Sequence, residues 1–176
     1  MDADQRRSRL GIVTYALGIH QRQRWAGRHA DLDPAAALLE EGHQLGAGGI
    51  QCPLDLQDAT AATALRQRVE RYKMFIEASL TLPRDEADLA RFEKQVQLAN
   101  EAGASVGRTV IMPGRRYEQF KSMAEFRQAE AQGLKSVQLA EPVVAKHRFR
   151  LALENHKDHR IAERLDLLQR FSSEFI

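Results

Sequence analysis

The chain has 176 residues, of which 43% are hydrophobic and 28% charged, a composition typical of a globular domain and unlike that of a disordered protein. Its 26 basic and 24 acidic residues leave a net charge of +2 and are interspersed, so we expect no nucleic-acid partner. Neither a run of about 18 apolar residues nor a signal peptide is present, which predicts a cytoplasmic protein without a membrane partner.

Cysteine usage limits the possible metal sites. Cys52 is the only cysteine, so the chain has no internal disulfide and no cysteine-rich zinc site. We expect Cys52 to be a small buried hydrophobic residue. Any bound metal must then be held by carboxylate and imidazole groups.

The first two strand and helix pairs lie in residues 10–72. A buried strand is predicted over residues 10–15, and Asp33 followed by Pro34 then predicts a capped helix start. That helix ends at Gly46. The second strand, residues 49–53, ends in proline. The helix after it has one apolar face, formed by Leu65, Val69 and Tyr72.

The third and fourth pairs follow the same alternation. Residues 74–80 predict a strand, and the helix after it has an apolar face of Leu89, Phe92, Val96 and Ala99 and closes at Gly103. Residues 108–111 predict the fourth strand. Ser122 and Glu125 form a capping-box pattern that starts a long helix through Phe126, Leu134, Val137 and Val144. Pro142 lies inside that helix, where we expect it to kink the helix or divide it.

The fifth pair ends the sequence. A strand is predicted over residues 149–154, followed by polar residues 155–158. The next helix has Ile161, Leu165 and Leu168 as its predicted apolar face, and a new apolar run begins at Phe175. Because parallel strands need helical crossovers, these alternations predict a parallel α/β sheet.

Periodicity alone does not separate an open doubly wound sheet from part of a closed barrel, whereas the positions of the polar residues do. Polar side chains stand near the predicted strand ends: His20, Gln51, Glu77, Arg115 and residues 154–158. In parallel α/β folds, chemistry gathers at those ends. No glycine-rich phosphate loop follows the first strand, so a nucleotide-binding fold loses its main support and a barrel is favoured.

Three segments resemble strands of the xylose-isomerase-like TIM barrel superfamily: residues 10–15, residues 75–80 and, above all, Leu-Ala-Leu-Glu-Asn-His-Lys-Asp at residues 151–158. The superfamily contains sugar-phosphate isomerases, ketose epimerases, inosose dehydratases and apurinic endonucleases. The resemblance implies a partial (β/α)8 barrel, a single domain over residues 1–176 that lacks the last three of eight units. An endonuclease would need more histidines and a basic groove, which this sequence does not show.

The resemblance also implies an activity. Family members that interconvert sugars move a proton beside a carbonyl with the help of a divalent metal. The family's metal ligand at the end of the fifth strand corresponds to Glu154, which would serve as both metal ligand and catalytic base for manganese, magnesium, cobalt or zinc. The other ligands come from strands that this sequence does not contain. We therefore expect either an incomplete isomerase or epimerase acting on a sugar or sugar phosphate, or a non-catalytic half-barrel that only binds or oligomerises.

Each assigned residue has a second, structural interpretation. Glu154 either serves the reaction or ends the strand and caps the next helix. His156 shares the face of Glu154 and contacts substrate if the strand persists; otherwise it is a loop histidine bonded to backbone. Glu77 either lines the pocket or is bonded to a partner, because an unpaired buried carboxylate is costly.

The two remaining substrate assignments are in loops. His20, with Trp25, predicts a wall that stacks on a sugar ring, although an ordinary surface loop has the same pattern. Arg115, with Arg116, predicts a contact to a substrate phosphate, although paired arginines also occur on solvated faces. A homo-oligomer is expected from the unpaired edge strands of an open barrel.

Overall fold

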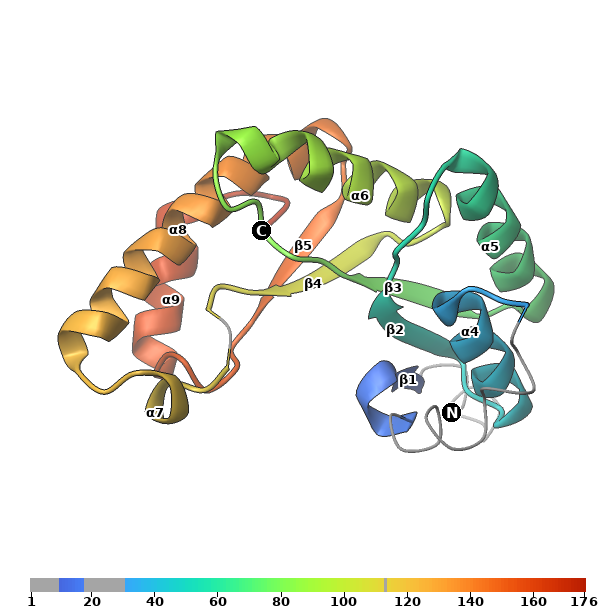
Figure 1. Cartoon of the computed structure of the whole chain (residues 1–176), viewed down its shortest axis with the longest axis horizontal. Coiled ribbons are helices and arrows are strands. Elements are labelled where there is room, and N and C mark those ends of the chain that lie inside the picture. Colours follow the sequence, from blue (N-terminus) through green and yellow to red (C-terminus); the bar gives the residue numbers. More distant parts are fainter. Residues whose placement is uncertain (1–9, 18–30, 113) are drawn as a thin grey trace. The chain divides into compact units, whose positions relative to one another are not determined.

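The structure is a computed structural model that describes residues 10–17, 31–112 and 114–176. Two compact units make up the chain: residues 1–79 with 98–105, and residues 80–97 with 106–176. Figure 1 labels the elements of both units. Within each unit the strands are parallel, follow each other in sequence order and alternate with helices.

The first unit contains three strands and their helices. Its elements are β1 (Gly11–Val13), the short 3-10 helix η1 (Thr14–Leu17), α4 (Pro34–Gln44), β2 (Gly49–Pro53), α5 (Ala59–Tyr72) and β3 (Phe75–Ser79). The bounds of β2 agree with the prediction, whereas β1 is shorter than predicted because η1 begins at Thr14. The register places Gln51 of β2 beside Val13 of β1 and Glu77 of β3.

Local signals place the helices of the first unit as predicted. The Asp33 carboxylate accepts hydrogen bonds from the backbone N–H groups of Ala35 and Ala36, both at 3.0 Å, and so caps α4. Leu38 and Leu39 of α4 are fully buried. Tyr72, at the end of α5, donates its hydroxyl to the Glu40 carboxylate.

One close approach fixes a glycine in β2. The Phe75 ring lies against the backbone of Gly49, where a Cβ atom would come within 2.4 Å of the ring. A side chain at position 49 would displace the ring. The strand therefore requires glycine at this point for space rather than for backbone conformation.

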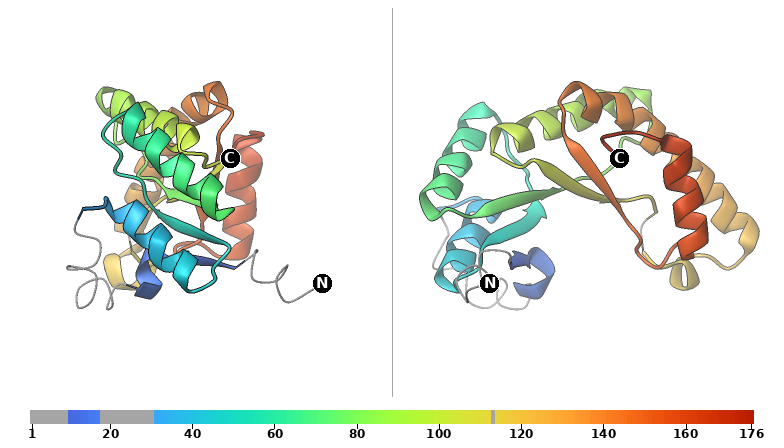
Figure 2. Two further views of the ribbon diagram at one scale, coloured as in Figure 1. Left: turned by 90° about the vertical axis from the view of Figure 1, so that its right-hand side faces the viewer. Right: turned by 180° about the vertical axis from the view of Figure 1, so that it is seen from behind.

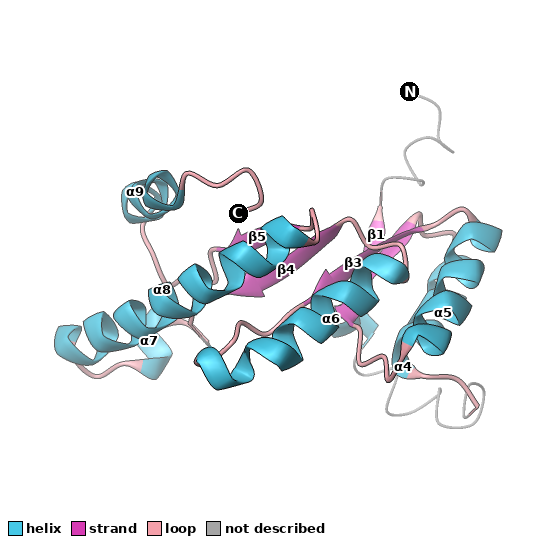
Figure 3. Ribbon diagram, turned by 90° about the horizontal axis from the view of Figure 1, so that it is seen from above, coloured by secondary structure: helices cyan, strands magenta, loops and turns pink. Residues whose placement is uncertain are grey.

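The second unit contains the remaining strands and helices of the described residues. Its elements are η3 (Glu86–Asp88), most of α6 (Leu89–Glu101), β4 (Val106–Val110), α7 (Arg116–Gln119), α8 (Met123–Lys146), β5 (Arg150–Glu154) and α9 (Ile161–Phe171). The short helix α7 has no counterpart in the sequence predictions. Figure 3 shows α8 running along one side of β4 and β5.

The predicted start of α8 is confirmed, and of the two outcomes predicted for Pro142, a kink or a division, the division does not occur. Ser122 Oγ accepts from the backbone N–H of Glu125 at 3.2 Å, and the Glu125 carboxylate accepts from that of Lys121 at 2.8 Å. The helix then continues undivided through Pro142. Pro142 and Gln138, whose carbonyl loses its helical partner, are both exposed, so water can satisfy that carbonyl.

The predicted core face of α9 is also wrong. Ile161, Leu165 and Leu168 are 79%, 55% and 37% exposed, while Arg164 and Leu167 are buried. The Arg164 guanidinium bonds to the buried Asp158 carboxylate, which turns that side of the helix inward. An ion pair, rather than the apolar stripe, therefore sets the rotation of α9.

The C-terminal residues lie along β5. The backbone N–H of Leu151 donates to the carbonyl of Phe175 at 2.7 Å. Figure 2, in its right-hand view, shows this end of the chain beside β5 and α9. The apolar run that the sequence predicted at Phe175 is therefore hydrogen-bonded to the start of β5.

Candidate functional site

In each unit, helices cover one face of the strands, and no α-helix of the described residues covers the other face, called here the helix-free face (Figure 3). The covered face of β2 and β3 is formed by Ile50, Cys52, Ile76 and Ala78, all buried. Alternation places Gln51 and Glu77 on the opposite, helix-free face, where both are half-buried. The Gln51 amide donates to a Glu77 carboxylate oxygen at 2.8 Å, so Glu77 has a partner on the neighbouring strand.

The second unit repeats this arrangement with a charged partner. Leu151 of β5 is buried on the covered face, whereas Glu154, the last residue of β5, is on the helix-free face. Arg108 of β4 is on the same face, and its guanidinium contacts the Glu154 carboxylate in an ion pair. Both side chains are about one-third exposed, although Glu154 Oε2, the oxygen that faces Arg108, is itself buried.

Of the other predicted substrate residues, Arg115 and His156 lie in loops. His20 lies outside them, as does Trp25. Arg115 precedes α7, and its guanidinium donates to Glu118 at 2.7 Å. His156 is half-buried in the loop beyond β5, because the strand ends at Glu154. Their substrate roles stay predictions.

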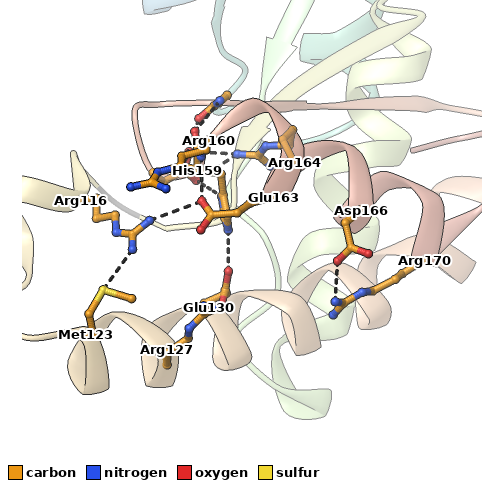
Figure 4. Close-up of polar contacts among 12 residues, drawn as sticks. Arg116, Met123, Arg127, Glu130, His159, Arg160, Glu163, Arg164, Asp166 and Arg170 are labelled. Carbon is orange, nitrogen blue, oxygen red and sulfur yellow. Dashed lines mark hydrogen bonds and ion pairs between the residues drawn. The ribbon is translucent and has the colours of Figure 1, made fainter.

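A buried charge cluster lies after β5, and the sequence analysis missed it. The His159 side chain is fully buried, with Nε2 2.8 Å from a Glu130 carboxylate oxygen and Nδ1 3.3 Å from Asp158. Arg164 donates to both Asp158 oxygens at 3.0 Å. Figure 4 shows His159 between α8 and the start of α9.

The cluster shifts the titration of its members. The Asp158 carboxylate, 3.3 Å from Nδ1, raises the pKa of His159, burial opposes this, and the hydrogen bond to Glu130 adds to it. Burial by itself raises the pKa of Asp158, but the His159 bond and the Arg164 charge outweigh it, so that this pKa is lowered. The cluster is therefore a set of mutually compensating charges in which the pKa of His159 lies above its ordinary value.

The signal for this cluster in the sequence is incomplete. Asp158 ends the segment that resembles the family and Arg164 follows six residues later, but Glu130 lies 29 residues before His159. Only the packing of α8 brings these two side chains together. A fold resemblance that stops at residue 158 does not reveal the pair.

The described residues do not by themselves fit a divalent cation. Among them, no group of three or more His, Cys, Asp or Glu side chains is placed to hold one ion. Glu154 supplies a single carboxylate, and the Arg108 guanidinium beside it would repel a cation. Hard divalent ions need six or more oxygen ligands, several of them from the protein or substrate.

Comparison with solved structures decides the fold. A D-psicose 3-epimerase, crystallised in the presence of D-fructose, matches 94% of this chain with a TM-score of 0.65 at 13% identity. The chain therefore shares the fold of the matched part of that structure. An L-ribulose 3-epimerase matches 95% of the chain (TM-score 0.55, 16% identity), and a xylose isomerase domain protein from Planctomyces limnophilus matches 78% (0.57, 12%). No family model and no curated protein matches the sequence.

The likeness confirms the predicted fold class, an α/β chain of successive parallel units as in part of a TIM barrel. The chain spans 60%, 54% and 58% of the lengths of these three structures. In the part of the chain that the structure describes, no helix is both long and apolar enough to cross a bilayer. The predictions of a single domain and a cytoplasmic location stay predictions.

Proposed function

We propose that this chain binds a sugar or sugar phosphate on the helix-free face of its strands, and that it is the sugar-binding part of an isomerase or epimerase. The three similar structures are named for psicose, ribulose and xylose chemistry, which supports a sugar ligand. The polar side chains of that face provide donors and acceptors suited to hydroxyl groups.

One observation supports the proposal above all others: Glu154 ends β5 on the helix-free face, beside Arg108. A carboxylate and a guanidinium at the carboxyl end of parallel strands form a donor and acceptor pair where barrel enzymes bind substrate. The carboxylate accepts from sugar hydroxyls and is the group that we assign to proton transfer beside a carbonyl.

The predicted divalent metal enters no step of this proposal. Glu154 is its one assigned ligand among the 176 residues, and Arg108 already holds that carboxylate. We expect weak Mn²⁺ binding by the wild-type chain in calorimetry, with no change in Glu154→Gln. Tight Mn²⁺ binding that Glu154→Gln removes would instead show that the ion pair opens to a metal.

Sugar binding is tested by titrating the protein with D-psicose and D-fructose and following backbone amides by NMR. Shifts are expected at the ends of β4 and β5 and are expected to be lost in Glu154→Gln and Arg108→Gln. Arg150→Gln, which removes an exposed cation from the same face at the other end of β5, is the matched control. Equal shifts with glycerol, or unchanged sugar shifts in Glu154→Gln, would contradict the proposal.

A non-catalytic protein that oligomerises is the alternative, and the exposed apolar side of α9 favours it. Ile161, Leu165 and Leu168 expose a stripe that a second copy of the chain would cover. Light scattering distinguishes the two: Leu165→Lys is expected to leave a monomer unchanged and to dissociate a dimer built on α9. Sugar binding by the dissociated chain would leave the first proposal standing.

A further inference from the structure

A cavity of about 540 Å³ lies beyond the carboxyl ends of β4 and β5, within the second unit. The segments after the two strands form its walls, residues 116–126 and residues 157–160. Four of the lining residues are cations, namely Arg116, Lys121, Lys157 and Arg160, and Asp158 is the one acid among them. The cavity does not include Glu154 or Arg115.

The acid of the cavity is already neutralised. Both Asp158 oxygens accept from buried Arg164, and His159 adjoins it at 3.3 Å. Two nitrogens of Arg164, Nε and Nη1, are buried without an acceptor. The charge of Asp158 is thus compensated, and Arg164 behind it keeps two donors without an acceptor.

The cations at the rim are only partly compensated. Glu163 lies 3.4 Å from the Arg116 guanidinium, and its carboxylate also accepts from the backbone N–H of Arg160. Within the described residues, the side chains of Lys121, Lys157 and Arg160 make no ion pair. The positive groups therefore exceed the acids that face them, which favours an anion.

The position of Arg116 is set by packing. Its guanidinium carbon lies 3.7 Å from the centre of the buried Phe126 ring, and its Nη2 lies 3.1 Å from Met123 Sδ. Figure 4 shows Arg116 reaching toward both Met123 and Glu163. A guanidinium held over an aromatic face keeps its plane, so it loses little entropy when it binds.

A hydrogen bond joins the two walls of the cavity at Lys157, a residue with a strained backbone. Lys157 has a φ of 62°, a left-handed conformation that costs energy for a residue other than glycine. Its carbonyl accepts from the backbone N–H of Arg116 at 3.4 Å. Ser122, the N-cap of α8, also lines the cavity, so the positive end of a long helix adds to the potential.

From these observations we infer that the cavity binds the phosphate group of a phosphorylated small molecule, held by Arg116, Lys121, Lys157 and Arg160. Phosphate accepts several charge-assisted hydrogen bonds at once, which matches several cations with few competing acids. Tyr117 and Phe120 line the same cavity and offer apolar surface to the attached sugar or base. The inference of phosphate binding depends on the cavity alone. Only the further step, that a sugar carries the phosphate, rests on the proposed function.

Calorimetry with inorganic phosphate, D-fructose 6-phosphate, D-fructose and AMP tests this inference. The double variant Lys157→Gln with Arg160→Gln removes two exposed cations of the rim, and Lys135→Gln, an exposed lysine of α8 outside the cavity, is the control. We expect phosphate binding to weaken by about tenfold or more in the double variant, to remain in the control and to fall with added salt. Circular dichroism confirms folding.

The outcomes separate this inference from the proposed function. Tighter binding of D-fructose 6-phosphate than of inorganic phosphate supports a sugar phosphate, and tighter binding of AMP supports a nucleotide. If phosphate binds but no sugar does, the cavity remains assigned to phosphate and the proposed sugar binding is wrong. Phosphate affinity that is equal in wild type and double variant would overturn the inference.

Discussion

The helix-covered and the helix-free faces of the strands differ in what their side chains do. The covered faces bury Ile50, Ile76 and Leu151, whereas the free faces expose polar pairs, Gln51 with Glu77 and Arg108 with Glu154. Buried apolar area stabilises a fold, and a solvent-exposed ion pair contributes little. Substitutions on the free faces are therefore expected to test ligand binding with little effect on folding.

The largest expected effect is on the covered face. Phe149→Ala removes a fully buried ring that packs against Gly107 and is expected to lower the free energy of unfolding by about 3–5 kcal/mol. Urea unfolding followed by circular dichroism measures it. Tyr117→Ala, at an exposed ring, is the control and is expected to change stability by less than about 0.5 kcal/mol. Equal effects of the two variants would show that the covered face stabilises the fold no more than an exposed side chain does.

A helix that covers the sheet depends on a small residue. A Cβ on Gly133 of α8 would lie 2.4 Å from Ile111 Cγ2 and 2.6 Å from the Ile111 carbonyl oxygen. Gly133→Ala gains helix propensity, but the backbone contact forces α8 away, so we expect a net loss of about 1–3 kcal/mol. Thermal unfolding measures it against Gln138→Ala, an exposed site of the same helix. A stabilised Gly133→Ala would mean that α8 does not approach β4 so closely.

The buried cluster beyond β5 gives a pH-dependent effect. Because the pKa of His159 is raised in the folded state, its contribution is fully present below its ordinary value of 6.5 and is lost as the pH rises through the folded value. Stability is therefore expected to fall above pH 6.5, by at most about 1.4 kcal/mol per pH unit. His159→Gln should remove that slope, while His156→Gln should retain it. Unfolding in urea across the pH range measures both.

The free face is expected to show a small effect on stability. Arg108→Gln breaks the ion pair with Glu154, and because both side chains are partly exposed we expect a change below about 1 kcal/mol. The same urea experiment measures it beside Phe149→Ala. A loss of stability as large as that of Phe149→Ala would show that this ion pair stabilises the fold. The free face would then contribute to stability as much as the covered face.

The smallest effect concerns Cys52, on the covered face of β2. Burial raises the pKa of its thiol to about 12, and the nearby Asp33 and Asp55 carboxylates add to this. The folded protein is expected to react with a thiol reagent at pH 8 only as fast as it unfolds. Fast labelling of the native chain would contradict the burial of this face.

Local patterns in the sequence were enough for most elements. The Asp33 and Ser122 caps, the glycine at 103 that ends α6 and the apolar face of α6 act within a few residues, so their signals are read directly from the chain. The alternation of these elements predicted the parallel α/β fold. Glu154 at the end of β5 was likewise placed by its segment alone.

Tertiary structure alone decided how the side chains pair. Arg108 meets Glu154 because β4 and β5 align in one register, and Glu130 meets His159 because α8 passes the loop after β5. Periodicity showed that α9 has an apolar stripe but not which side faces inward, and the bond between Arg164 and Asp158 turned the stripe outward. A sequence encodes local preferences residue by residue, whereas the partner of a side chain depends on contacts between elements that are distant along the chain.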